Sequence, residues 1–261
     1  MAFQRYQSNP YTIGQISPYK LSRSKIELFT QCPRCFWLGE RLKIKRPDGP
    51  PFQINKAIDE LFKKEFDSYR LKKEPHPLML AYKIDAIPFA HKELDKWREN
   101  FVGVQTLHEP TNLLLFGAVD DVWVTPKSEL IVVDYKATSK KTEVNLDADW
   151  QNSYKRQMEI YQWLLRRNGF DVSNTGYFVY ANGKADADGF YDKVEFKTKI
   201  IAHTGSSDWV ESTITDMKAC LEGDMPKVGS SIMGGECDFC AYARVRTELT
   251  LEYLRKNQKT A

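Results

Sequence analysis

Long apolar runs are missing from this 261-residue sequence, and their absence sets the first limit on its class. A transmembrane helix needs about 20 consecutive, mostly apolar residues, and the sequence has no stretch of that kind. The first ten residues, MAFQRYQSNP, also lack the apolar segment of a secretory signal. We therefore expect a chain with no membrane partner that works in the cytoplasm.

A strong surplus of charge of either sign is also absent. The chain has 38 lysine and arginine residues against 35 acidic residues, a net charge of +3. Such a balance neither shows nor excludes nucleic-acid binding, because a local groove matters more than the sum. With 42% apolar and 28% charged residues and no internal repeat, the composition is that of an ordinary globular protein.

Histidine is scarce, which argues against a metal site built from this residue type. The four histidines are His76, His91, His108 and His203. Their positions have no mutual spacing that is typical of a ligand set. We expect them to be structural or surface residues.

Only five cysteines are present, and their placement is informative. Cys32 and Cys35 form a CxxC pair near the start, Cys237 and Cys240 form a second near the end, and Cys220 stands alone. In a cytosolic chain such pairs more often bind a metal or a cluster than form disulfides. The two pairs complete one four-thiolate site if the chain ends meet; the alternative is two pairs of reduced, partly buried thiols.

The periodicity of apolar residues predicts alternating helices and strands. Helices are expected after the capping residues Ser22 and Ser24, on a segment with Ile26, Phe29 and Phe36, and over 52–70, 92–100, 150–167 and 208–221. Strands are expected over 101–108, 113–124, 129–136, 176–180 and 190–201. The order helix, three strands, helix, strand predicts an α/β fold with a mixed sheet.

Two acidic residues lie on the apolar side of the expected 52–70 helix. Asp59 falls at the edge of its apolar stripe, and Glu65 falls inside it. Acidic groups that face a core are costly unless something pairs with them. Their placement is a first indication of a functional site.

The clearest signal comes from two neighbouring strands. The first carries Asp120, and the second, IVVDYKATS, places Asp134 and Lys136 two residues apart. Side chains two apart in a strand point to the same face. Asp134 and Lys136 therefore share a face, while Tyr135 points away from it.

This set of groups suits phosphodiester hydrolysis. Hard divalent ions such as Mg²⁺ prefer carboxylate and carbonyl oxygens. They acidify a bound water and offset charge on a phosphoryl oxygen, and a neighbouring lysine can orient that water or stabilise transition-state charge. The alternative is that Asp134 and Lys136 form a structural ion pair.

These residues resemble the PD-(D/E)XK nuclease superfamily, specifically its RecB-like branch. The branch has a GxxD strand, a (D/E)xK strand and a helix with QxxxY, which here correspond to Gly117 to Asp120, Asp134 to Lys136, and Gln157 with Tyr161. The resemblance covers about residues 52–180. It implies a restriction-endonuclease-like αβββαβ core with a mixed central sheet and, in this chain, extra helices at both ends.

The resemblance also implies roles for individual residues. Asp120, Asp134 and the backbone carbonyl of Tyr135 would be ligands of Mg²⁺ or Mn²⁺. Lys136 would be the catalytic lysine, and Gln157 and Tyr161 would contact the site or the substrate backbone.

Two assignments within this pattern have alternatives. RecB-like members usually carry a metal-binding histidine on the first core helix, where this chain has none. Asp59 lies near that place and is preferred as the replacement, with Glu65 as the rival. Asp121 follows Asp120 directly, and a shift of one residue would reverse the face.

The cysteines resemble the metal site of RecB-like nucleases of the AddB type. Those proteins hold an iron–sulfur cluster with one cysteine before the core and three after it. Here the pattern is two and two, with Cys35 as the substitute and Arg246 near the expected last cysteine. The resemblance favours a 4Fe–4S cluster slightly over Zn²⁺, and either would clasp the two ends of the chain.

Together these features predict three segments and one activity. Residues 1–51 form an arm and a helix with the first cysteine pair, residues 52–200 the nuclease core, and residues 201–261 a helical region that packs back on the N-terminal helix. The leading hypothesis is a Mg²⁺- or Mn²⁺-dependent deoxyribonuclease for DNA repair, recombination or mobile-element processing, working with proteins of those pathways. The alternatives are an inactive DNA-binding module of the same fold and a cysteine–metal scaffold.

Overall fold

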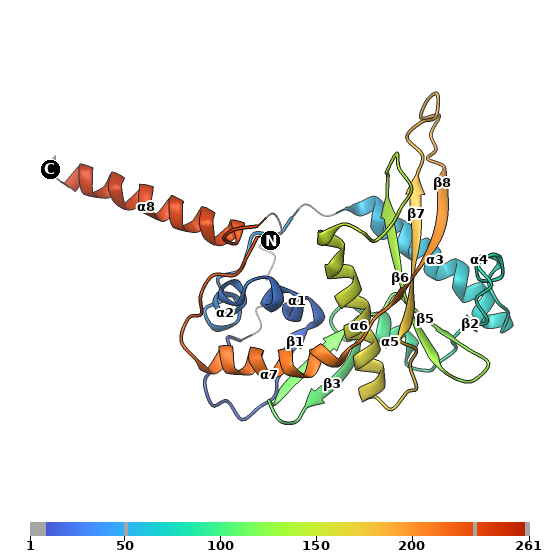
Figure 1. The fold of residues 1–261 in the computed structure, drawn as a ribbon, viewed down its shortest axis with the longest axis horizontal. Coiled ribbons are helices and arrows are strands. Elements are labelled where there is room, and N and C mark those ends of the chain that lie inside the picture. Colours follow the sequence, from blue (N-terminus) through green and yellow to red (C-terminus); the bar gives the residue numbers. More distant parts are fainter. Residues whose placement is uncertain (1–8, 50–51, 232–233, 259–261) are drawn as a thin grey trace, which may run out of the picture.

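The computed structural model describes residues 9–49, 52–231 and 234–258. The first part of the predicted N-terminal arm, residues 1–8, lies outside this range, as do residues 50–51. Figure 1 shows a body of sheet and helices from which one long C-terminal helix extends. Among the described residues no helix is both long and apolar enough to cross a membrane.

The main sheet has five strands in the order β2-β5-β6-β7-β8. The strands are β2 (Ile87–Pro88), β5 (Asp121–Val124), β6 (Leu130–Thr138), β7 (Thr175–Gly183) and β8 (Phe196–Thr204). β6 and β7 are parallel, and the other neighbours are antiparallel. The first six residues of β6 are all buried, as expected for a central strand covered on both faces.

A second sheet of three strands has the order β1-β4-β3. It contains β1 (Tyr19–Ser22), β3 (Val104–His108) and β4 (Leu113–Gly117), with β1 parallel to β4. The sequence predicted a single strand over 113–124, but the chain leaves strand geometry between β4 and β5. The Val119 N–H bonds to the carbonyl of Trp97 at 3.0 Å instead of to a strand partner. The break therefore depends on a contact from a distant segment.

Helices cover both faces of the main sheet. α6 (Asn152–Arg167) follows a short 3₁₀ turn, η1 (Asp149–Gln151), and packs on β6 and on the smaller sheet. α3 (Gln53–Lys72) lies over the opposite face of β6, where Phe62 and Phe66 pack against Tyr135. One apolar core thus lies on each side of β6.

The N-terminal helix expected around the first cysteine pair is two helices, α1 (Arg23–Gln31) and α2 (Pro33–Arg41). Cys32 between them has an extended backbone, with φ −157°. Proline at the first position of α2 explains the break, because it lacks the N–H that a continuous helix would need.

The remaining helices complete the body. These are α4 (Pro77–Ala81), α5 (Leu94–Arg98), α7 (Asp208–Glu222) and α8 (Asp238–Gln258). α7 packs against α1 and α2, and α8 begins at the second cysteine pair. β8 continues to Thr204, beyond residue 200, while the three-segment division itself stays a prediction.

The predicted fold class is confirmed. A mixed α/β architecture, with a mixed central sheet and extra helices at both ends, is what the structure contains. β1, β2 and α4 were not anticipated, because each has only two to five residues and too short a pattern to detect.

Candidate metal-dependent nuclease site

The centre of the site is the end of β6. Asp134 and Lys136 point to the same side of the strand, and the Lys136 ammonium forms an ion pair with Oδ2 of Asp134. Asp134 is completely buried, and its Oδ1 accepts a hydrogen bond from Gln157 Nε2 at 2.7 Å. The Asp134 carboxylate therefore lies between a strand lysine and a helix amide.

The QxxxY residues of α6 lie on the helical face that covers this carboxylate. Gln157 Nε2 also lies 3.3 Å from the Tyr161 hydroxyl. A Cβ added to Gly117 would come within 2.6 Å of the Tyr161 ring. The glycine of the GxxD segment thus leaves the space that the tyrosine ring fills.

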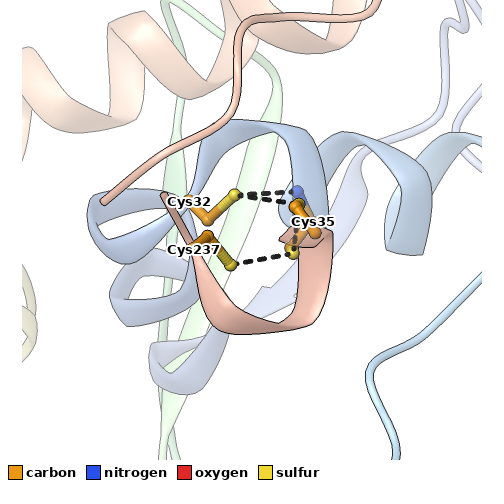
Figure 2. Close-up of side chains that lie close together, drawn as sticks. Cys32, Cys35 and Cys237 are labelled. Carbon is orange, nitrogen blue, oxygen red and sulfur yellow. Dashed lines mark hydrogen bonds between the residues drawn. The ribbon is translucent and has the colours of Figure 1, made fainter. Parts of the chain in front are cut away.

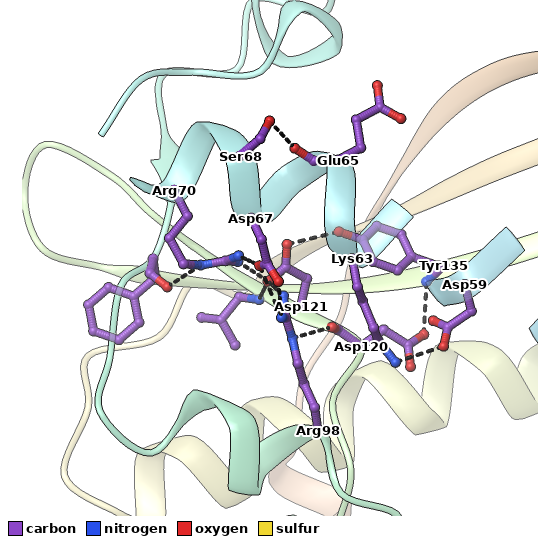
Figure 3. Close-up of polar contacts among 12 residues, drawn as sticks. Asp59, Lys63, Glu65, Asp67, Ser68, Arg70, Arg98, Asp120, Asp121 and Tyr135 are labelled. Atoms are coloured by element: carbon purple, nitrogen blue, oxygen red, sulfur yellow. Dashed lines mark hydrogen bonds and ion pairs between the residues drawn. The ribbon is translucent and has the colours of Figure 1, made fainter. Parts of the chain in front are cut away.

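Asp120, and not Asp121, is the acidic residue beside Asp134. Asp120 lies in the break before β5, and its Oδ2 accepts the backbone N–H of Tyr135 at 2.9 Å. Its negative charge contributes to the raised pKa of Asp134. The broken strand thus directs Asp120 toward the end of β6 (Figure 3).

Asp121 belongs to a separate buried network. Its carboxylate is fully buried and contacts the guanidinium groups of Arg70 and Arg98. Its Oδ2 accepts the Tyr135 hydroxyl at 2.8 Å. Arg98 also donates to the backbone carbonyl of Asp120 at 3.1 Å, which fixes the chain at the break.

Asp59 and Glu65, the two rivals on the first core helix, occupy different surroundings. Burial is the main cause that raises the pKa of Asp59, and the negative charge of Asp120 is the second. The two carboxylates therefore lie close enough to interact. Glu65 points away in Figure 3 and bonds to His76 Nε2 at 2.9 Å. The geometry thus brings Asp59, rather than Glu65, to the candidate site.

The site has more negative charge than its own lysine offsets. The pKa of Asp134 is raised to about 6. Burial is the largest cause and the charge of Asp120 also raises the pKa, while the Lys136 ammonium lowers it. The pKa of Lys136 is raised despite burial because Asp134 and Asp120 both favour its charged form. The Lys136 ammonium and, at longer range, the Arg23 guanidinium partly offset the charge on Asp134.

One of the acidic side chains, Asp59, borders a small pocket. Asp59 Oδ1 is buried and accepts no hydrogen bond, while the buried Asp134 Oδ2 is paired with the Lys136 ammonium. The pocket has a volume of about 110 Å³ and is lined by Asp59, Tyr135, Lys136 and Tyr154 together with Asn55, Ile58 and Ala137. Carboxylate oxygens of this kind are the donors that Mg²⁺ and Mn²⁺ prefer, so the residues present fit such an ion.

The possible ligand atoms of the carboxylate site lie farther apart than those of the cysteine site. Within the described part of the chain, only the four cysteines bring three or more ligand atoms within 4.8 Å of one another. The β5–β6 ladder ends at the pair Asp121–Val133, beyond which the Tyr135 N–H is taken by Asp120. A role for the Tyr135 carbonyl as a ligand stays a prediction.

Two neighbours of the site, Tyr154 and Arg23, were not predicted from the sequence. The Lys136 ammonium lies 4.6 Å from the centre of the Tyr154 ring, and the Arg23 guanidinium lies 5.9 Å from the centre of the Tyr161 ring. Tyr154 is three residues before Gln157, so helical spacing gave a signal that it shares this side of α6. No local pattern points to Arg23, because α1 reaches the site only through tertiary packing.

The four cysteines of the two CxxC pairs lie together, with every sulfur within 4.8 Å of the others. Figure 2 shows three of them, Cys32, Cys35 and Cys237. The sulfur of Cys240 lies 3.8 Å from that of Cys32 and 3.5 Å from that of Cys35, and Cys35 lies 3.8 Å from Cys237. Cys220 is outside the set and contacts the carbonyl of Pro33. Cys35 thus lies with the other three cysteines of the two pairs.

The thiols are surrounded by hydrogen-bond donors. Burial alone would raise the pKa of Cys32, but the backbone N–H groups of Cys35 and Gly229 outweigh it and bring that pKa to about 7. Arg46 donates to Cys237 Sγ at 3.3 Å. These donors favour the thiolate form of Cys32, the form that binds metals, while burial raises the pKa values of Cys35 and Cys240.

Comparisons with known proteins add family membership to this geometry. No curated protein matches the chain. A solved structure described as "Crystal structure of SSO0001" aligns over 82% of this chain and 81% of its own, at 13% identity and a TM-score of 0.36. The family model of the PD-(D/E)XK nuclease superfamily matches residues 53–245. That match covers most of the sequence, and the chain belongs to the PD-(D/E)XK nuclease superfamily.

Proposed function

We propose that this protein is a metal-dependent nuclease that hydrolyses DNA phosphodiester bonds. The observation that carries the proposal is the meeting of Asp120, Asp134 and Lys136 at the end of β6. A purely structural ion pair would not require the second carboxylate, nor the buried Asp59 Oδ1 that accepts no hydrogen bond.

The proposed ligands of Mg²⁺ or Mn²⁺ are Asp120, Asp134 and the carbonyl of Tyr135, with Asp59 in place of the usual histidine. When bound, the ion supplies Lewis acidity toward a phosphoryl oxygen and lowers the pKa of water. Lys136 is the catalytic lysine in this proposal, because its ammonium is held beside both carboxylates and borders the pocket.

Gln157 and Tyr161 have proposed roles next to the metal ligands. The Gln157 amide holds Asp134 Oδ1, which leaves Oδ2 directed toward the Lys136 ammonium. Tyr161 receives the other contact of that amide and packs into the space beside Gly117. Both side chains keep the carboxylate in one orientation.

The branch and the cellular setting are also part of the proposal. The GxxD, DYK and QxxxY segments, with cysteine pairs on both sides of the core, support a RecB-like, AddB-like nuclease. We place it in DNA repair, recombination or mobile-element processing in the cytoplasm, with DNA as its partner. In this proposal, the cysteine site clasps an N-terminal segment (1–51) and a C-terminal segment (201–261) beside the 52–200 core.

The spacing of the cysteine sulfurs supports one tetrahedral ion, which we propose to be Zn²⁺ instead of the iron–sulfur cluster expected from the resemblance. Zn–S bonds of about 2.3 Å in a tetrahedron put the sulfurs roughly 3.8 Å apart. Separations of 3.5 and 3.8 Å between these cysteines match that value. The ligands of a four-iron cluster stand on the corners of a larger body and lie farther apart.

The test is cleavage of labelled single- and double-stranded DNA by purified protein with Mg²⁺, with Mn²⁺ and with EDTA. We expect cleavage with either ion and none with EDTA. Lys136→Ala should reduce the rate by at least about 100-fold, the order of effect of losing one group that stabilises transition-state charge.

Lys127→Ala is the matched control, because Lys127 is an exposed lysine in the turn at the opposite end of β6. Its rate should equal that of the wild type. Cleavage that survives in folded Lys136→Ala, or that does not depend on a divalent ion, would contradict the assignment.

A further inference from the structure

A pocket lined by lysines lies beyond the end of β6, outside the carboxylate site. We call it the lysine pocket; it has a volume of about 480 Å³, and its lining includes Lys140, Lys141, Lys184 and Lys197. A neighbouring pocket of about 300 Å³ shares Lys141, Asn182 and Lys197. The two hollows form one basic region.

Three of these lysines form no ion pair within the described part of the chain, although Lys197 lies near enough to Glu143 to lower its pKa. Lys184 pairs with Glu195, and the nearby Lys199 pairs with Glu143. Lys140, Lys141 and Lys197 are in no ion pair there, although Asp186 is also part of the pocket lining. Unpaired cations around a hollow are suited to an anionic ligand.

The segment that carries Lys140 and Lys141 is fixed to the sheet. The Asn182 side chain bonds to both the N–H and the carbonyl of Lys140, at 2.8 and 3.0 Å. Farther along the loop, Lys199 Nζ donates to the carbonyl of Val144 at 3.0 Å. The lysines thus stand on a held loop, which lowers the entropic cost of binding.

The lysine pocket opens on the same sheet face as the proposed catalytic lysine. Lys136, Tyr180 and Lys199 are direct partners across β6, β7 and β8, and Asn182 pairs with Lys197 in the next row of that face. Direct partners point to one face. Two strand spacings of about 4.8 Å put the backbones of Lys136 and Lys199 roughly 10 Å apart.

Aromatic rings lie between the proposed catalytic lysine and the lysine pocket. The Lys136 ammonium lies over the Tyr154 ring, Tyr154 meets Trp150 edge to face at 5.4 Å, and the Lys140 ammonium lies 5.7 Å from the centre of the Trp150 ring. Trp150 is 43% exposed although it is a large apolar side chain. Cations alternating with an exposed ring are the pattern of a surface for single-stranded nucleic acid.

We propose that single-stranded DNA leaves the catalytic site over Trp150 and enters the lysine pocket. Phosphates contact Lys140, Lys141 and Lys197, and an unpaired base stacks on the exposed indole. This inference rests on the proposed nuclease function and deepens it, because it names the form of the substrate. A duplex offers phosphates but no free base face, so only a single strand uses both features.

The experiment measures binding of a labelled single strand, and of the duplex of the same sequence, without added divalent ion. The combined variant Lys140→Ala, Lys141→Ala, Lys197→Ala should weaken single-strand binding and reduce the slope of log affinity against log salt by about 2, from about 0.7 for each lost phosphate contact. Trp150→Ala should weaken single-strand binding about tenfold with little change in that slope.

Two controls keep the outcome readable. Lys83, Lys92 and Lys127 are exposed lysines on other loops, and replacing all three with alanine should leave the slope unchanged. Trp150→Tyr keeps a ring and should restore most of the affinity that Trp150→Ala loses, which a folding defect would not explain.

An unchanged salt slope in the lysine variant would overturn the inference, and so would duplex binding as sensitive to Trp150→Ala as single-strand binding. Because binding is read without a divalent ion, on intact DNA, the result does not depend on catalysis. Failure of cleavage and failure of this binding surface are therefore separate results.

Discussion

At the scale of single residues, the site is defined by carboxylates that outnumber the ammonium group shared between them. Asp134 and Asp120 both act on Lys136, and the pKa values of Asp134 and Asp59 are raised, mainly by burial. Buried carboxylates of this kind are costly without a counter-charge. A divalent ion removes that cost, so ion binding and stability should be linked.

The raised pKa of Asp134 gives this linkage a direction. Its value of about 6 in the folded chain is above the ordinary 3.8, so protonation stabilises the metal-free fold. That contribution is complete below about pH 4 and is lost as the pH rises through about 6. Mg²⁺ needs the ionised carboxylate, so its apparent affinity should fall about tenfold per pH unit below about 6.

The measurement is the increase in Tm on adding Mg²⁺, taken at about pH 5 and about pH 8. We expect a clear increase at the higher pH and little at the lower. Asp134→Asn should lose the increase at both. An equal increase at the two pH values in the wild type would be inconsistent with Asp134 as a ligand.

At the scale of elements, two interruptions build the two sites. The break between β4 and β5 directs Asp120 to the end of β6, while Asp121 enters the network with Arg70 and Arg98. The extended Cys32 between α1 and α2 brings its sulfur toward the second cysteine pair. A continuous strand or helix at either point would separate the groups.

The cysteine site gives a prediction at this scale. Cys32→Ser removes one of four ligands and should abolish zinc binding, lowering stability by about 3 kcal/mol, or Tm by roughly 10 °C. Zinc content and thermal unfolding measure this directly. The control is Cys220→Ser, because the Cys220 thiol is outside the set.

Cys220→Ser should keep one zinc per chain and nearly the same Tm. Iron with visible absorption in anaerobically purified wild-type protein would instead favour the cluster. A Cys32→Ser variant with full zinc content would show that the four thiols are not one site.

Much of this arrangement could be predicted from local patterns. The spacing of Asp134 with Lys136, and of Gln157 with Tyr161, predicts a shared face on a strand and on a helix. The choice of Asp120 over Asp121 could not be settled, because the strand break depends on the carbonyl of Trp97. Contacts between distant segments have no sequence period.

The same limit applied elsewhere in the chain. The network of Asp121 with Arg70 and Arg98 joins three elements, and no spacing links them. The break between α1 and α2 at Cys32 is a different case, because Pro33 is a local signal from which it could have been predicted.

At the scale of the whole molecule, the two candidate metal sites lie in different parts of the fold. The cysteine site joins α1 and α2 to Cys237, just before α8, and to Cys240 in the first turn of α8. The carboxylate site lies where β6 meets α3 and α6. From there, the exposed Trp150 and the lysine pocket extend across β7 and β8.

The most direct test of this account is anomalous diffraction from a crystal soaked in Mn²⁺. We predict a manganese peak bound by Asp120 and Asp134, with the Lys136 ammonium moved off Asp134 Oδ2 toward the pocket. A crystal in which manganese binds elsewhere, while Lys136 keeps its ion pair with Asp134, would contradict the account.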